Sequence, residues 1–188
     1  MRIAISGAQS TGKTTLARDL AEAIPNTRVE PEPFRVLRNQ LGLVSGADSM
    51  TPEQEIALIE HSGRRMQALR AGETVVYDRC GLDALAHALV AADMGNPAFT
   101  SEWLRTLEEA TNTAMKPLTL LVVVPVSDDL PLEDDGVRST DLTYQKAVDQ
   151  RIRSLASEFP RVMEVNGTRA ERVSRILDRV DPEGRYGR

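Results

Sequence analysis

The stretch Gly7-Ala8-Gln9-Ser10-Thr11-Gly12-Lys13-Thr14 decides the fold of this 188-residue chain. It matches the phosphate-loop pattern G-x-x-x-x-G-K-[ST] in full and follows the apolar run Ile3-Ala4-Ile5. Glycines at both ends let the backbone turn tightly enough to point its N–H groups at phosphate oxygens. Beyond the loop, Leu16, Leu20 and Ile24 share one face of a predicted helix, whose N-terminus favours anions. The sequence therefore predicts a strand, a loop and a helix that together bind a nucleoside triphosphate.

The side chains of this loop have separate expected roles. Lys13 is expected to reach the β- and γ-phosphates as a point charge, and the Thr14 hydroxyl is placed to ligate Mg²⁺. ATP and Mg²⁺ are therefore the expected cofactors. The residues that we expect to bind the nucleotide here are Gly7, Ala8, Gln9, Ser10, Thr11, Gly12, Lys13, Thr14 and Thr15.

Composition limits the class of protein. With 41% hydrophobic and 27% charged residues, the chain is typical of a soluble globular protein with a core of ordinary size. No apolar run approaches the ~20 residues that cross a bilayer, and the chain passes directly into an apolar strand. We therefore expect no membrane partner, no signal or transit peptide, and a cytoplasmic location, which the lone Cys80 also fits. The net charge of −5 disfavours a protein that coats nucleic acid.

Apolar strand-like runs alternate with amphipathic helical runs, which is typical of a parallel sheet with crossover helices. We therefore predict an α/β fold in one domain over residues 1–188, with a five-stranded parallel sheet, helices on both faces and a lid at about 126–140. The expected strands are Arg2–Ser6, Thr27–Glu30, Thr74–Asp78, Leu118–Pro125 and Val162–Asn166. The expected helices are Lys13–Ala23, Pro33–Leu41, Pro52–Ala71, Leu82–Ala92, Ser101–Met115, Asp141–Glu158 and Arg169–Arg179.

The third predicted strand ends in an acid followed by a base, Asp78-Arg79. In an open parallel sheet the chemistry gathers beyond the carboxyl ends of the strands, so both side chains should lie beside the phosphate loop. Asp78 is then a candidate ligand of Mg²⁺, directly or through water, and Arg79 a fixed cation for the transferring phosphoryl group or an anionic acceptor. The alternative is that Asp78 caps the helix that starts near Leu82, with Arg79 as its surface partner.

The second predicted strand runs into Glu30-Pro31-Glu32-Pro33-Phe34-Arg35. Its prolines make the backbone stiff and extended, which holds the two carboxylates in place. Glu32 is our first candidate for the base that accepts the proton of an attacking hydroxyl, and Glu30 the second. The alternative is a polar loop whose acids are merely solvated. Phe34 is placed to stack on an acceptor ring, and Arg35 to bind an acceptor phosphate or to pair with these glutamates.

Two later loops are further candidates. In the segment 133–139, Arg138 is expected to belong to a flap that covers the transferring phosphates, unless this is an acidic loop without function. After the fifth strand, Asn166 and Gly167 are expected to lay backbone groups against an adenine ring, with Arg169 or Arg172 stacking on it. An ordinary connecting turn explains that segment almost as well.

With these residues laid out, the chain resembles the P-loop kinases of nucleosides and nucleotides. It is most similar to the small ATPase-like kinases that include the ribosylnicotinamide kinase domain and many phage-encoded kinases. The likeness runs from Arg2 to about Leu177. Besides the phosphate loop it depends on Pro31-Glu32-Pro33, on Tyr77-Asp78-Arg79 followed by Asp83, and on Asp134-Asp135-Gly136-Val137-Arg138-Ser139.

This resemblance implies a role for each motif. In thymidylate and deoxynucleoside kinases, a Glu-Pro after the second strand and an acid-Arg pair after the third line the acceptor site. By that likeness Glu32 is the base or an acceptor contact, and Asp78 serves the metal. Arg79 contacts the phosphates, and Arg138 belongs to the lid. The expected acceptor contacts are Glu30, Glu32, Phe34, Arg35, His61, Arg65, Arg79 and Asp83.

Three functions are open at this point. The first is transfer of the γ-phosphoryl group of ATP to a nucleoside- or nucleotide-type acceptor. The second is a kinase that acts on 5-hydroxymethyluracil within DNA, as some phage relatives do. It requires an open basic groove, for which the candidates are Arg35, Arg38, Arg64, Arg65 and Arg70. The third is a nucleotide-dependent regulatory ATPase or switch, which the Asp-Arg ending of the third strand disfavours. Monomer and homodimer are both open.

Overall fold

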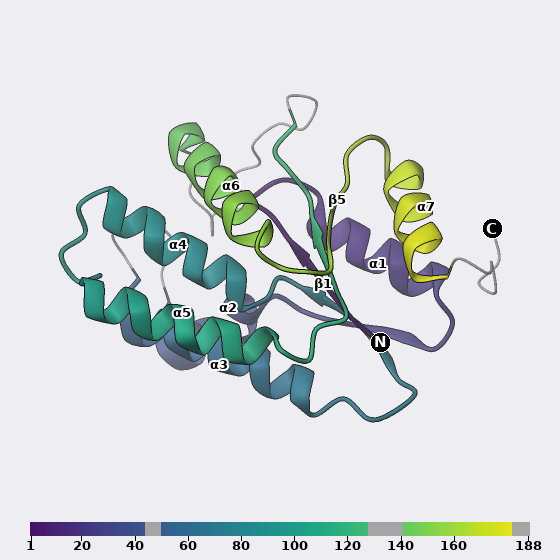
Figure 1. Cartoon of the computed structure of the whole chain (residues 1–188), viewed down its shortest axis with the longest axis horizontal. Coiled ribbons are helices and arrows are strands. Elements are labelled where there is room, and N and C mark those ends of the chain that lie inside the picture. The colour runs from purple at the N-terminus through teal and green to yellow at the C-terminus, as the bar shows by residue number, and fades with distance from the viewer. Residues whose placement is uncertain (44–49, 128–140, 182–188) are drawn as a thin grey trace.

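A five-stranded parallel sheet forms the centre of the protein in a computed structural model, which describes residues 1–43, 50–127 and 141–181. The strand order is β2-β3-β1-β4-β5, and all four pairings are parallel. The predicted α/β class is therefore confirmed (Figure 1). The strands are β1 Arg2–Ser6, β2 Thr27–Glu30, β3 Thr74–Asp78, β4 Leu120–Val123 and β5 Val162–Glu164.

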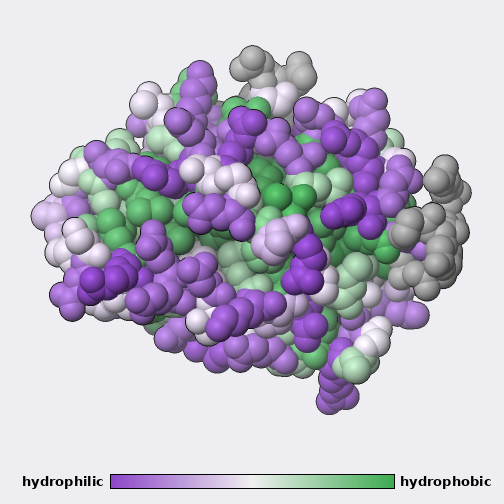
Figure 2. Space-filling model, in the orientation of Figure 1, coloured by the Kyte–Doolittle hydropathy of each residue, from purple (hydrophilic) through white to green (hydrophobic). Residues whose placement is uncertain are grey.

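Helices cover both faces of this sheet, because side chains alternate between the faces along each strand. Ile3 and Ile5 of β1 pack in one cluster with α1 and α7, whereas Ala4 packs in another with α4, α6 and the end of α3. Figure 2 shows mostly hydrophilic side chains over the visible face of the molecule, with hydrophobic ones in a band through its middle. The helices are α1 Lys13–Ala23, α2 Pro33–Leu41, α3 Pro52–Gln67, α4 Gly81–Asp93, α5 Ser101–Met115, α6 Leu142–Ala156 and α7 Arg169–Val180.

A third apolar cluster joins α2, α3, α4 and α5 beside the sheet (Figure 1). Helix α3 begins with a capping box between Thr51 and Gln54, with Pro52 in its first turn. It approaches α5 so closely that a Cβ on Gly63 would lie 2.9 Å from the Cβ of Ala114. This helical layer extends from the carboxyl end of β3, where the candidate site begins.

Several element boundaries differ from the prediction, and side-chain hydrogen bonds explain two of them. Helix α3 ends at Gln67 instead of Ala71, because the Arg2 guanidinium donates to the carbonyls of Met66 at 2.7 Å and Leu69 at 3.1 Å. Helix α6 starts at Leu142, since Asp141 is its N-cap and accepts from two backbone N–H groups. Strands β4 and β5 are each shorter than expected.

Arg138 and the rest of the expected lid beyond Ser127 lie outside the described residues. None of the helices described is both long enough and apolar enough to span a lipid bilayer.

Candidate active site

The phosphate loop connects β1 to α1 at the carboxyl edge of the sheet. A Cβ on Gly7 would collide with the backbone carbonyl oxygen of Val124, so only glycine allows this close approach. Gly12 has φ 84 and is the N-cap of α1, which leaves the first N–H groups of that helix directed at the loop. The close approach at Gly7 and the left-handed conformation at Gly12 therefore both favour glycine in this motif.

Lys13 is enclosed by the loop, with only 3% of its surface exposed. Its Nζ donates to the Ala8 carbonyl and, at 3.2 Å, to the Thr11 hydroxyl. Burial, reinforced by the charge of Arg79, lowers the pKa of Lys13 to about 7. An ammonium held in this way gains most from an anionic ligand, because neutral carbonyls compensate its desolvation only in part.

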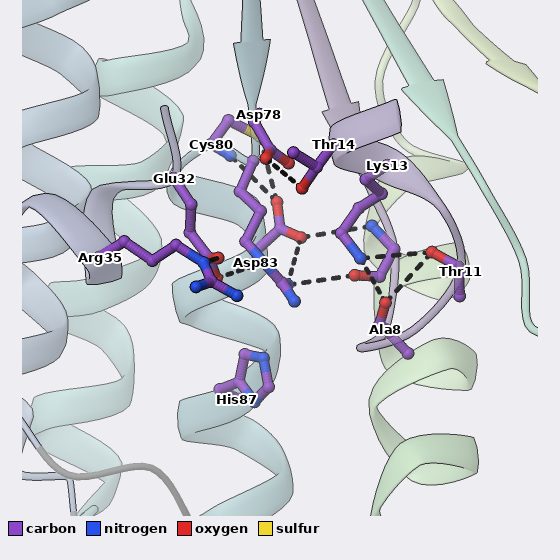
Figure 3. Close-up of polar contacts among 12 residues, drawn as sticks. Ala8, Thr11, Lys13, Thr14, Glu32, Arg35, Asp78, Cys80, Asp83 and His87 are labelled. Carbon is purple, nitrogen blue, oxygen red and sulfur yellow. Dashed lines mark hydrogen bonds and ion pairs between the residues drawn. The ribbon is translucent and has the colours of Figure 1, made fainter. Parts of the chain in front are cut away.

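The expected metal residues meet across the loop (Figure 3). The Thr14 hydroxyl donates to Asp78 Oδ2 at 2.6 Å, and Asp78 is buried at the end of β3. Asp78 does not cap the next helix, since the N-cap of α4 is Cys80. The described residues contain no group of three or more His, Cys, Asp or Glu side chains that could hold a metal by itself. This donor set suits Mg²⁺, which binds through one or two protein oxygens together with phosphates and water.

Arg79 lies at the centre of the site, 7% exposed and with a left-handed backbone at φ 72. Its Nε is 2.7 Å from Glu32 Oε1, and its Nη1 donates to Asp83 Oδ1 at 3.0 Å and to the Gly7 carbonyl at 3.1 Å. Burial alone would lower the pKa of Arg79, but Glu32, Asp83 and Asp78 raise it, so the guanidinium is always charged. One cation thus joins the β2–α2 segment, α4 and the phosphate loop.

Asp83 and Glu32 each contact a further group. Asp83 accepts from the backbone N–H of Gly7 at 3.3 Å and of Cys80 at 3.0 Å, so its carboxylate also holds the phosphate loop. Glu32 accepts from Arg35 Nε at 3.1 Å. In Figure 3 Glu32 lies against Arg35 and Lys13 points to Ala8 and Thr11, with Asp83 drawn between them. The sequence motifs that were expected to meet are therefore brought together.

The other expected acceptor residues form a second group on α3 and β2. Glu30 makes ion pairs with Arg28 and Arg65, and Arg65 also donates to the Pro31 carbonyl at 2.9 Å. His61 Nε2 lies 3.4 Å from the same guanidinium. Arg65 therefore fastens the segment before α2 to α3. Phe34 packs against the helical cluster of α2 to α5.

A cavity of about 430 Å³ adjoins the phosphate loop on its other side, between α1 and the β5–α7 turn. Gly12, Thr15, Gly167 and Arg169 line it, so residues from both expected nucleotide-binding segments border one cavity. Arg169 forms two hydrogen bonds to Asp19, at 3.0 and 2.6 Å. Asn166 lies beside this turn, where its side-chain oxygen accepts from Arg175 at 3.0 Å.

Three buried polar residues have contacts that the sequence did not predict: Gln145 and Glu55 had no assigned role, and Arg172 was expected only to stack on an adenine ring. Arg172 donates to the carbonyls of Thr11 at 3.0 Å and Gly167 at 2.9 Å, so it links the phosphate loop to the β5–α7 turn. Gln145 of α6 donates to the Gln9 carbonyl at 2.8 Å. Glu55 lies on the buried face of α3, and its spacing from the apolar Leu58 and Ile59 is the signal that would have found it.

The fold and site place the chain in a known class. A family model described as an AAA domain matches residues 2–172, and the chain belongs to this family. The fold is that of the P-loop kinases of nucleosides and nucleotides, as the sequence motifs predict.

Three solved structures illustrate this likeness. The NadR protein in complex with NR has a TM-score of 0.72 at 19% identity over 94% of this chain, which corresponds to 50% of the NadR chain. Deoxyadenosine kinase from M. mycoides with bound dATP has a TM-score of 0.70 at 16% identity, covering 96% of this chain and 99% of that one. Thymidylate kinase from Candida albicans gives 0.66 at 17%, covering 96% and 91%. A comparison with curated protein sequences finds no significant match.

Glu55 leads to a prediction about stability. Burial raises its pKa from 4.5 to about 8, against the opposing charge of Arg79. The folded chain therefore holds one more proton than the unfolded chain between these values, so this carboxyl lowers the free energy of unfolding as the pH rises through that window. Relative to wild type, Glu55→Gln should gain stability from pH 4.5 to about 8, by several kcal/mol at most, in denaturant titrations. A difference that stays constant with pH would contradict this.

Proposed function

We propose that the chain is an ATP- and Mg²⁺-dependent phosphotransferase that moves the γ-phosphoryl group to a nucleoside- or nucleotide-type acceptor. The observation that carries this proposal is the contact of Arg79 with both the phosphate loop and Glu32. It supports the proposal because a permanent cation and a carboxylate would then lie beside the terminal phosphate of a nucleotide bound by the loop. A protein that only bound a nucleotide would not need that pair. The likeness of the fold to nucleoside and nucleotide kinases supports the same class.

The donor half of the site holds the triphosphate. Loop N–H groups and Lys13 bind its oxygens, and the nucleobase lies in the cavity beside Arg169. Thr14 and Asp78 would hold Mg²⁺, which neutralises charge on the phosphate oxygens when bound. Arg172 and Gln145 keep the loop in shape by binding its outward carbonyls. These residues position the donor before any bond changes.

The acceptor half supplies a base and a cation. A hydroxyl oxygen of the acceptor attacks the γ-phosphorus, the bond from that phosphorus to the β–γ bridging oxygen breaks, and ADP leaves with the electron pair. Glu32 takes the proton of the hydroxyl, and Arg79 stabilises the negative charge on the transferring group. We assign the base to Glu32 because it shares the guanidinium of Arg79, whereas Glu30 pairs with Arg28 and Arg65.

The proposed acceptor is a free nucleoside or nucleotide and not a base within DNA. A DNA acceptor would need a groove of unpaired basic groups. Among the arginines expected for it, Arg35, Arg64 and Arg65 each pair with a glutamate, so we favour a free nucleoside or nucleotide. Labelled ATP should transfer phosphate to a nucleoside or nucleotide more efficiently than to hydroxymethylated duplex DNA. Faster, salt-sensitive labelling of DNA would favour the polynucleotide, and hydrolysis with every acceptor inactive would favour a switch.

Removing the donor contacts should abolish transfer. Lys13→Ala and Asp78→Ala are each expected to lower kcat at least about a hundredfold, because each removes a preorganised charge from the triphosphate site. Lys146→Ala, which removes an exposed ammonium from α6, is the matched control and should retain full activity. Initial rates of labelled phosphate transfer, with circular dichroism to confirm folding, measure this. Near wild-type turnover in either site variant would refute the assignment of the site.

The base assignment makes a separate prediction. Glu32→Gln keeps the side chain's size but accepts protons poorly, so kcat should fall about a hundredfold or more while the KM for ATP changes little. Steady-state kinetics at saturating acceptor separate the two parameters, with the exposed Glu53→Gln as control. An unchanged kcat would exclude Glu32 as the base, and a larger loss in Glu30→Gln would transfer the role to Glu30.

A further inference from the structure

Glu55 is a buried carboxyl that the proposed reaction does not use. It lies on the first turns of α3 and only 2% of its surface is exposed. Within the described part of the chain, its Oε2 has no hydrogen-bond partner. A buried polar atom in this state costs folding free energy that an apolar residue would not, so its presence calls for a ligand or a partner.

The surroundings of Glu55 place it beside the acceptor half of the site. One turn further along α3, Ile59 lies so close to the start of α4 that a Cβ on Gly81 would be 3.3 Å from it. Helix α4 carries Asp83 and follows Arg79 directly, and the charge of Arg79 acts on the Glu55 carboxyl. Glu55 therefore lies on the buried face of α3 that packs toward the start of α4, where Arg79 and Asp83 also lie.

The protein groups in that cluster are engaged with one another. Arg79 binds Glu32, Asp83 and the Gly7 carbonyl, while Asp83 accepts from two backbone N–H groups. Burial keeps Glu55 protonated at neutral pH, with a pKa of about 8. A neutral carboxylic acid offers an O–H donor beside a C=O acceptor, which is the pattern of an amide. It therefore suits an uncharged ligand edge with a donor beside an acceptor, and it disfavours an anionic one.

We propose that Glu55 determines acceptor specificity by binding the uncharged hydrogen-bonding edge of the acceptor's nucleobase. The inference rests on the proposed function, because it takes the acceptor to be nucleoside-like. It assigns the reacting hydroxyl to the Glu32–Arg79 side and the base to the α3 side. A nucleobase edge with adjacent donor and acceptor atoms satisfies both halves of the carboxyl at once, and a base without that pattern leaves the carboxyl unpaired.

Equilibrium binding tests this assignment independently of turnover. The full chain, loaded with Mg²⁺ and a non-hydrolysable ATP analogue, is titrated calorimetrically with nucleosides of each natural base. Glu55→Gln keeps a donor and an acceptor, whereas Glu55→Met and Glu55→Leu keep bulk and remove both. Glu53→Gln, an exposed position in the same turn of α3, is the matched control. Thermal unfolding verifies that each variant is folded. We expect the Met and Leu variants to be folded, because removing a buried unpaired carboxyl stabilises the folded state.

We expect wild type to prefer one class of base, and Glu55→Met and Glu55→Leu to weaken that affinity about ten- to a hundredfold and flatten the preference. Glu55→Gln should stay within about threefold of wild type, because it preserves the paired hydrogen bonds. Wild-type affinity and preference in the folded Met and Leu variants would overturn the inference, as would a wild type that binds no nucleoside. Binding that depends on Glu55 without phosphate transfer would support the inference and contradict only the proposed phosphotransferase.

Discussion

The buried guanidinium of Arg79 is the interaction on which the rest of the site depends. It contacts Glu32 from the segment before α2, Asp83 from α4 and the Gly7 carbonyl of the phosphate loop. Its left-handed backbone at φ 72 is a strained conformation of about 1–3 kcal/mol for a residue other than glycine. Removing the cation would take from the buried carboxylates of Glu32 and Asp83 the guanidinium that they share, a loss of about 3–5 kcal/mol in comparable cases. The contacts with these three segments therefore hold Arg79 in its strained backbone conformation.

This arrangement couples the two halves of the site. The phosphate loop is held from within by Asp83, which accepts from the Gly7 N–H. From outside it is held by Gln145 of α6 and Arg172 of α7, which bind the Gln9 and Thr11 carbonyls. A loop fixed from three elements presents its N–H groups without reorganisation, as binding of the proposed triphosphate would require. Arg79 in turn fixes the position of the loop relative to the carboxylate of Glu32.

Local signals predict much of this protein, and long-range contacts account for several features that they miss. Strands β1 to β3 and helices α1, α2 and α5 have the bounds that hydrophobic periodicity, prolines and caps indicate. The end of α3 could not be predicted, because it depends on hydrogen bonds from Arg2, distant in the chain. The phosphate loop is evident in the sequence since its chemistry is local, whereas Arg172 and Gln145 acquire their roles only through tertiary packing. Glu55 is a polar residue at a buried helical position. The sequence alone does not show what it faces, because that depends on how α3 packs against α4.

The most direct test of the central claim is the turnover of Arg79→Lys at saturating MgATP and acceptor. Lysine keeps the positive charge, but a single ammonium cannot contact Glu32, Asp83 and the Gly7 carbonyl in the way that the planar guanidinium does. The account predicts that kcat falls at least about a hundredfold while the calorimetric affinity for MgATP stays within about threefold. A folded Arg79→Lys variant with a kcat close to wild type would show that charge alone suffices, and would contradict the account.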